Sequence, residues 1–125
     1  RLALMLAVIE KRLNIKMYNR DVFLNIVGGI KVVDPAIDLA VIFAILSSNY
    51  DKSIPRTTCF AGEVGLNGEI RPVQKIEQRI AEAEKMGFHK MIISKYGLKG
   101  INLNKYKIKI VTVANLKDFN EGIFE

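Results

Sequence analysis

The stretch from Phe60 to Val73, FAGEVGLNGEIRPV, constrains the fold more than any other, because it has the pattern of a β-hairpin. Asn67 and Gly68 are the pair typical of a two-residue type I′ turn, in which both positions need positive φ. Pro72 has no N–H for a sheet ladder, so we expect the returning strand to lie at an edge or to end there. A helix is predicted to follow over 75–86, where apolar residues recur at helical spacing.

Two further helices are predicted before the hairpin. Residues 1–13 carry apolar side chains on two faces, which indicates burial against more than one element. Asp34 is a good N-cap and Pro35 suits a first helical position, and the helix they open, 36–46, is apolar nearly all round. We expect it to be the central buried helix. Asp38 is its one charge, and either complements the helix dipole locally, which we favour, or meets a buried partner across a subunit interface.

The remaining elements complete one layered domain over 1–125. Strands are predicted at 21–27, 57–63, 91–93 and 108–113, and a last short helix after an Asn115 cap. The order α-β-α-β-β-α-β-β-α is that of a mixed α/β (α+β layered) fold with a single hydrophobic core.

Charge is distributed unevenly along the chain. The run from Lys85 to Lys117 holds eight lysines and no Asp or Glu. All the excess of positive over negative charge in the chain, whose net charge is +6, therefore lies in this run. Such asymmetry favours an anionic partner, with nucleic acid first and an acidic membrane surface second, although a lysine-rich solvated surface would look the same. We take five lysines as DNA-binding candidates that form part of a DNA-facing or ring-lining surface: Lys95, Lys99, Lys105, Lys107 and Lys109.

The sequence offers little catalytic or metal-binding chemistry. Its one histidine, His89, and its one cysteine, Cys59, are thirty residues apart, which disfavours a zinc site or a Ser-His-Asp triad. Glu63 and Glu69 flank the hairpin turn and are better explained as exposed strand charges than as an acid–base pair. A lone thiol, with no signal peptide and no long apolar run, predicts a cytoplasmic protein without membrane contact.

Ordered blocks along essentially the whole chain resemble the RadA/Sms family of bacterial DNA repair proteins. They are RLALMLAVIEKR (1–12), DVFLNIVGGIKV (21–32), DLAV (38–41), the hairpin segment and AEAEKMGF (81–88). The hairpin alone is similar to that of Lon-protease-type domains more widely. The resemblance implies a Lon-protease-like (ribosomal protein S5 domain 2-like) fold, here N-terminally truncated, as the C-terminal domain of a longer protein.

The same resemblance implies that this domain is not an enzyme. Lon-type peptidases carry a nucleophilic serine at the start of the central helix and a lysine at the start of the helix after the hairpin. Ala36 and Glu77 stand at those positions here, and neither can perform the chemistry. Lys75 lies two residues before Glu77 and would need a register shift to substitute.

For the longer parent, the resemblance implies a four-cysteine zinc finger and a RecA-like ATPase before this domain. Zinc, ATP and Mg²⁺ belong to those parts, and no cofactor is expected in this chain. The implied role is that of a scaffold in the response to DNA damage, where the parent drives branch migration in recombination. This domain would assemble a hexameric ring and bind DNA, with recombinase filaments as a further partner. The alternatives are a pure oligomerisation module and, less favoured, a residual Ser/Lys peptidase.

Overall fold

The computed structural model of the chain describes residues 2–13, 15, 34–119 and 121–124. The predicted strand 21–27 lies outside these residues. The α-helices are α1 (Leu2–Leu13), α2 (Asp38–Tyr50) and α3 (Ile76–Lys85). The strands are β1 (Thr58–Ala61), β2 (Glu63–Val64), β3 (Ile70–Arg71), β4 (Lys90–Ser94) and β5 (Lys109–Val113). The described residues also contain short 3-10 turns: η1 (Pro35–Ile37), η2 (Leu103–Lys105), η3 (Leu116–Asp118) and η4 (Glu121–Ile123).

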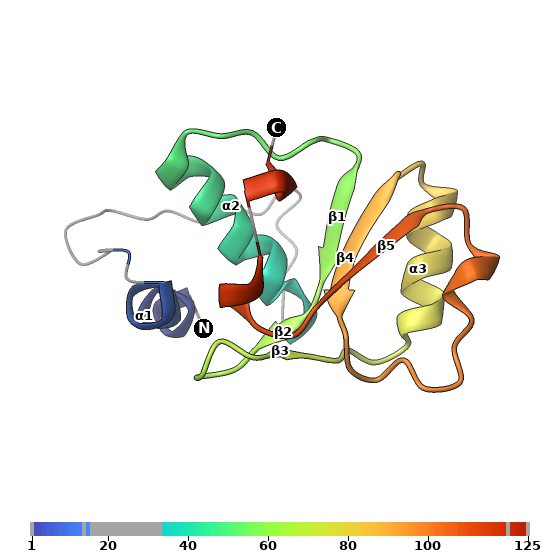
Figure 1. The fold of residues 1–125 in the computed structure, drawn as a ribbon, viewed down its shortest axis with the longest axis horizontal. Helices are drawn as coiled ribbons and strands as arrows, with labels where there is room; N and C mark the ends of the chain where they lie inside the picture. Colours follow the sequence, from blue (N-terminus) through green and yellow to red (C-terminus); the bar gives the residue numbers. More distant parts are fainter. Residues whose placement is uncertain (1, 14, 16–33, 120, 125) are drawn as a thin grey trace.

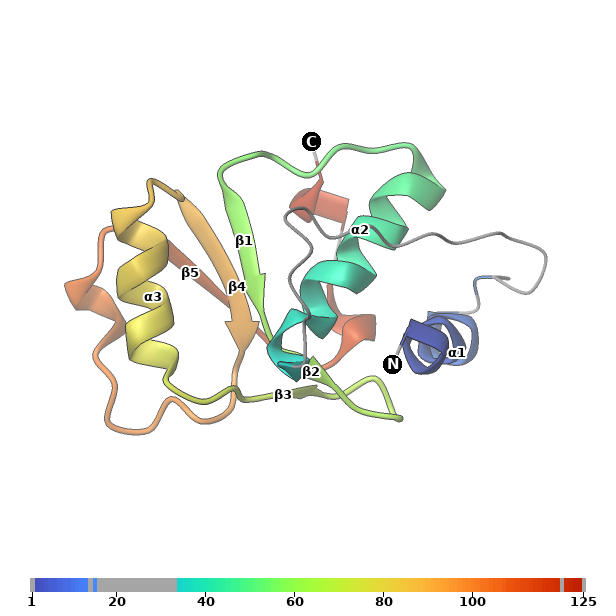
Figure 2. The same cartoon turned by 180° about the vertical axis from the view of Figure 1, so that it is seen from behind.

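A parallel sheet lies between helices on its two faces. Its strand order is β1-β4-β5, and Cys59 pairs with Met91, which pairs with Ile110. Figures 1 and 2 show α2 on one side of this sheet and α3 on the other. Strands β2 and β3 form a separate antiparallel hairpin that lies below α2 in Figure 1, with its turn next to α1. The described residues thus form a mixed α/β fold, as predicted, and the structure adds that its main sheet is parallel.

The core has two layers because the strands alternate their side chains across the sheet. On one face, Ile92 packs with the fully buried Leu39, Ile42 and Phe43 of α2, and Phe43 stacks on Phe60 at 5.0 Å between ring centroids. On the other face, Met91 and Ile93 pack against α3 through the buried residues Ile80 and Ala83. The helix predicted at 36–46 packs into the core through one side, with Leu39, Ile42, Phe43 and Leu46 buried, whereas Ala44 on the other side is exposed.

Several element boundaries differ from the predictions. Helix α2 continues to Tyr50 and ends where Asp51 adopts a left-handed conformation with φ of 53°. The strand predicted at 57–63 divides at Gly62, because Gly62 donates to Ala36 O (2.9 Å) and accepts from Leu39 N (3.0 Å) instead of joining a ladder. The last predicted helix is two short 3-10 turns, the first capped by Asn115.

The hairpin is present, but its predicted type I′ turn is wrong. Gly68 has a positive φ of 79°, whereas Asn67 does not. Gly68 N–H donates to Gly65 O (3.0 Å), and Gly65 N–H donates to Glu69 O (2.9 Å). This is a longer loop in which a turn centred on Leu66 and Asn67 is followed by a left-handed glycine. Strand β3 ends at Arg71, immediately before Pro72, as predicted.

Candidate functional site

Asp38 joins the central helix to the hairpin. Its side chain is fully buried in the first turn of α2, and its carboxylate accepts a hydrogen bond from Val64 N at 3.1 Å. A carboxylate at this place also complements the positive end of the helix dipole. The sequence left open whether Asp38 meets a buried partner. In the structure it does, and the partner is the β2 backbone of the same chain.

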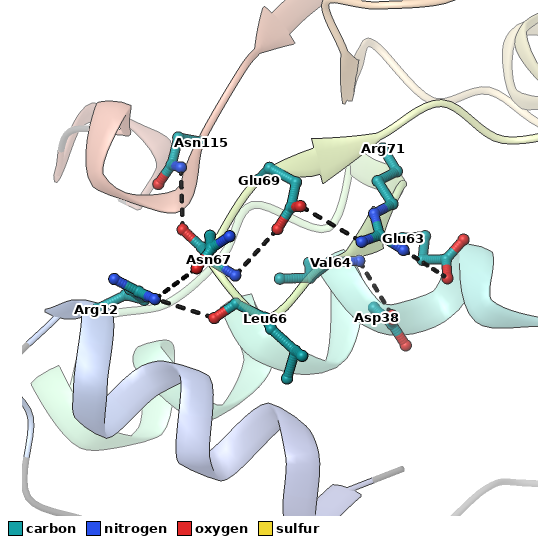
Figure 3. A network of polar contacts seen from close by, with 9 residues as sticks. All are labelled: Arg12, Asp38, Glu63, Val64, Leu66, Asn67, Glu69, Arg71 and Asn115. Atoms are coloured by element: carbon teal, nitrogen blue, oxygen red, sulfur yellow. Dashed lines mark hydrogen bonds and ion pairs between the residues drawn. The ribbon is translucent and has the colours of Figure 1, made fainter.

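The apex of the hairpin is held by α1 and by the segment that follows β5 (Figure 3). Arg12 Nη2 donates to Asn67 Oδ1 at 2.6 Å, and Arg12 Nε donates to Leu66 O at 3.3 Å. From the other side, Asn115 Nδ2 donates to Asn67 O at 3.2 Å. We call Arg12, Asn67, Glu69 and Asn115 the apex clasp. It fixes a turn that would otherwise be held by its own backbone alone.

Glu69 completes the apex clasp from within the hairpin. Its carboxylate accepts from Asn67 N at 3.0 Å and pairs with Arg71 at 3.4 Å, as Figure 3 shows. Desolvation would raise the pKa of Glu69, but hydrogen bonds from the backbone and from Arg71 outweigh it and lower the pKa. A Cβ at Gly65 would lie 2.1 Å from Glu69 Oε1, so the absence of a side chain there leaves room for this carboxylate.

An ion pair joins the start of the central helix to α3. Asp34 caps η1 by accepting from Ala36 N at 3.0 Å, and its other oxygen binds Arg79 Nη2 at 2.8 Å. The hydrogen bond from Arg79, and then that from the Ala36 backbone, lower the pKa of Asp34. Ala36 itself is buried and presents a methyl group at this junction.

The two residues at the expected peptidase positions do not share a contact. Glu77 is exposed and pairs with Lys105 at 3.4 Å, whereas Arg79 is the α3 residue that reaches the start of α2. Glu77 and Arg79 are two residues apart, which is about 200° around a helix, so they lie on opposite sides of α3. Lys75 is exposed and caps α3 in a left-handed conformation with φ of 59°.

The five candidate lysines fall into two groups. Lys95 follows the carboxyl end of β4 and donates its N–H to Val113 O at 3.0 Å, with Lys99 in the loop beyond. Val113 is the last residue of β5, and Lys109 is the first residue of that strand. At roughly 3.3 Å per residue, Lys109 and Val113 are about 13 Å apart. The tract therefore spans both ends of the sheet.

Local contacts distinguish the lysines further. Lys105 lies over the Tyr106 ring at 5.1 Å, and hydrogen bonds with Tyr106 and then Glu77 raise the pKa of Lys105. Lys95 lies over the Tyr96 ring at 5.8 Å. Among the described residues no carboxylate forms an ion pair with Lys99, Lys107 or Lys109, which are all exposed.

Sequence reasoning missed three cations of this structure. Lys90 is the register partner of Lys109 on the neighbouring parallel strand, so their side chains leave the same face of the sheet. Strand pairing could have identified it, because Lys90 belongs to the same lysine-rich run. No local signal identifies Arg12 or Arg79, since their partners Asn67 and Asp34 are 55 and 45 residues away.

The remaining candidates show no reactive arrangement. His89 is exposed, and burial raises the pKa of the half-buried Cys59 thiol, which keeps it neutral. Within the described residues, no three His, Cys, Asp or Glu side chains come together as a metal site. None of the helices described is both long and apolar enough to cross a bilayer.

Comparison with known proteins defines the class of this chain. The sequence model of the family described as subunit ChlI of Mg-chelatase matches residues 5–96, and the chain belongs to that family. Over 99% of its length the chain is 46% identical to DNA repair protein RadA of Streptococcus pneumoniae. Over 94% of its length it is 45% identical to DNA repair protein RadA of Bacillus subtilis and 42% identical to that of Chlamydia muridarum.

These comparisons confirm the resemblance to RadA/Sms proteins and with it a relationship to DNA repair. The matches cover 29%, 26% and 26% of the three relatives in turn. The chain thus spans about a quarter of the length of the curated relatives it matches.

Proposed function

We propose that this chain is a non-proteolytic, Lon-protease-like scaffold domain of a DNA repair protein and that it binds DNA through the exposed lysines of the run 85–117, which we call its lysine-rich end. The observation that carries the proposal is the run from Lys85 to Lys117, with eight lysines and no carboxylate. The exposed lysines at positions 99, 107 and 109 have no ion pair within the described residues, so their charge is available to phosphates. Lysines neutralise phosphates without reading sequence, and the binding is salt-sensitive.

The proposal extends to a larger assembly. As the C-terminal part of a longer protein, the chain would contribute to a homo-hexameric ring. The parent would add a zinc finger and a RecA-like ATPase that uses ATP and Mg²⁺, and would act with recombinase filaments in the cytoplasm during branch migration. The relatives, which are DNA repair proteins about four times the length of the match, support this wider setting.

Salt titration of DNA binding tests the proposal directly. Fluorescence anisotropy with labelled single- and double-stranded DNA should give a log affinity that falls linearly with log salt between about 50 and 200 mM. A triple variant, Lys99→Gln, Lys107→Gln and Lys109→Gln, should reduce the slope by about 2 to 3, because each phosphate contact contributes about 0.7 to 0.9.

A matched control separates the effect of these lysines on DNA binding from the effect of net charge alone. Replacing Lys11, Lys52 and Arg56 by Gln makes the same change in charge outside the tract, and we expect the wild-type slope. Absence of binding even at low salt, or equal slopes in the two triple variants, would overturn the DNA contact and leave a pure oligomerisation module.

A residual peptidase is the less favoured alternative. Ala36 offers a buried methyl group where the family's nucleophile would stand, and the hydroxyl of the buried Ser94 donates to Ile70 O at 2.7 Å. We expect no cleavage of casein by the chain. Cleavage that disappears in a Lys75→Gln variant would support the peptidase instead.

A further inference from the structure

Tyr96 is the most exposed aromatic side chain among the described residues. It is 51% exposed, Tyr50 is 38% exposed, and the other described rings are buried or half-buried. A single exposed ring is common and needs no explanation by itself. Tyr96 differs because it lies inside the lysine run, beside Lys95, on a backbone that is held in place.

The backbone of the loop that follows β4 is fixed at its first two residues. Lys95 N–H donates to Val113 O at 3.0 Å, and Tyr96 N–H donates to the Ser94 hydroxyl at 3.0 Å. That hydroxyl is buried and in turn donates to Ile70 O at 2.7 Å, which joins the loop to β3. A group carried on a fixed backbone loses little conformational entropy when it binds, so the Tyr96 ring is pre-organised for contact.

Side-chain packing anchors the same loop, which leaves the lower end of β4 in Figure 1. Gly97 has a positive φ of 75°, and a Cβ at this position would lie 2.6 Å from Pro72 Cβ. Tyr96 and Gly97 line a small hollow together with Pro72 and Val73. Leu98 packs against the apolar layer on the α3 side of the sheet. These contacts tie the loop to the fold and leave half of the Tyr96 side chain open to solvent.

The second tyrosine of the lysine run is placed differently. Tyr106 is half-buried and packs against the apolar layer on the α3 side of the sheet. The cation over its ring, Lys105, already pairs with Glu77. Lys95, over the Tyr96 ring at 5.8 Å, has no ion pair within the described residues. Only Tyr96 therefore combines an open ring with an unpaired cation.

Proteins that bind single-stranded nucleic acid combine these two features, because bases stack on aromatic rings while cations follow the phosphates. In a duplex the faces of each base are covered by its neighbours, so an unpaired base is the one that can reach a ring. The cation–π contact of an exposed lysine is weaker than base stacking. An arriving base therefore displaces Lys95 from the Tyr96 ring and leaves its ammonium free for a phosphate. Lys99, also exposed and three residues further on, offers a second phosphate contact.

We propose that Tyr96 stacks on an unpaired base and that the loop 95–99 thereby binds single-stranded DNA in preference to duplex. The inference rests on the proposed DNA contact and names the form of DNA that this part of the lysine-rich end takes. It also divides the work between side chains. The lysines set how binding depends on salt, and Tyr96 sets how binding depends on unpaired bases.

Abasic DNA isolates the stacking contact, because it keeps the phosphates and lacks the bases. Fluorescence anisotropy at one salt concentration compares a labelled thymidine oligonucleotide with an oligonucleotide of equal length made of abasic sites. The wild type should bind the thymidine oligonucleotide about tenfold more tightly, as expected for one stacked base. Tyr96→Ala should lose this factor, bind abasic and duplex DNA within about twofold of the wild type, and keep the wild-type salt slope, because no phosphate contact is removed.

Two control variants accompany Tyr96→Ala, and circular dichroism checks that each is folded. Tyr96→Phe keeps the ring and should bind like the wild type. Tyr50→Ala removes an exposed ring outside the lysine run and should also bind like the wild type.

Three results would overturn the stacking contact: a wild type that binds thymidine and abasic DNA equally, a Tyr96→Ala variant that still distinguishes them, or an equal loss of duplex binding in that variant. Salt-dependent binding without any effect of the bases would overturn this inference and leave the proposed function standing. Absence of binding to every DNA at low salt would overturn both.

Discussion

The hairpin end and the lysine-rich end of this molecule use positive charge in opposite ways. At the hairpin end, Arg12 binds a carbonyl and an amide oxygen, and Arg71 pairs with Glu69 and Glu63. At the lysine-rich end, Lys99 and Lys107 are exposed without an ion pair among the described residues. The cations of the first end are structural, and those of the second remain available to a partner.

Side-chain chemistry explains this division. Arginine presents a planar set of donors that can hold several fixed oxygens at once, which suits a clasp around a turn. Lysine presents a compact, hydrated charge on a flexible stem, which suits phosphates whose positions vary. A net charge of +6 therefore says less about binding than the placement of each cation.

The largest effect should come from the buried carboxylate at the hairpin end. Asp38→Ala leaves the buried N–H of Val64 without its acceptor, and we expect the free energy of unfolding to fall by about 2 to 3 kcal/mol. Urea denaturation measures the loss. Asp118→Ala, at an exposed position, is the control and should change stability by less than about 0.5 kcal/mol. Equal losses in the two variants would contradict a structural role for the Asp38 contact.

The lysine-rich end should show the converse behaviour. Replacing Lys107 and Lys109 by Gln should weaken DNA binding about tenfold at low salt, because two phosphate contacts are lost. The unfolding free energy should stay within about 0.5 kcal/mol of the wild type, since neither side chain has an ion pair to lose among the described residues. A variant that unfolds more easily but binds DNA normally would reverse our assignment of this end.

Arg12→Gln sharpens the contrast, because it removes one positive charge from the hairpin end. The hydrogen bonds to Leu66 O and Asn67 Oδ1 are exposed, so we expect a loss of about 1 kcal/mol in unfolding free energy. DNA affinity measured by anisotropy should not change. Lys11→Gln, one residue earlier and equally charged, should alter neither quantity. If Arg12→Gln weakens DNA binding as much as a lysine variant does, the two ends are not distinct.

Local sequence signals predicted most elements of the fold. The Asp34 cap, the stop before Pro72 and the strand predicted at 108–113 each depend on residues close in the chain, and each is present in the structure. The turn type was wrong because Asn-Gly is compatible with more than one loop length. The glycine adopts the positive φ in either case, and Leu66 takes the additional position.

The candidate site was less predictable because its contacts are long-range. The lysine run identified the charged end, but the parallel register that separates Lys95 from Lys109 and places Lys90 beside Lys109 is a property of the folded sheet. The apex clasp joins Arg12 to Asn67 and Asn67 to Asn115, across 55 and 48 residues. No periodicity or local motif predicts such pairs.

The smallest effect concerns the ion pair between the start of the central helix and α3. Arg79 lowers the pKa of Asp34 below its ordinary value of 3.8, so the pair stabilises the fold fully above that pH. As the pH falls through the lowered folded-state pKa, the carboxylate is protonated and the contribution is lost. Because Asp34 is exposed and screened by solvent, we expect less than about 1 kcal/mol.

Asp34→Asn isolates this contribution, because asparagine can still cap η1 while its charge is absent. Urea unfolding of both proteins should show the wild type as more stable at neutral pH, with the difference vanishing in acid and shrinking in high salt. Asp118→Asn should show no such pH dependence. A difference in stability that persists below the folded-state pKa would mean that capping of η1, rather than the ion pair with Arg79, accounts for it. Arg79 would then belong with the available cations instead of the structural ones.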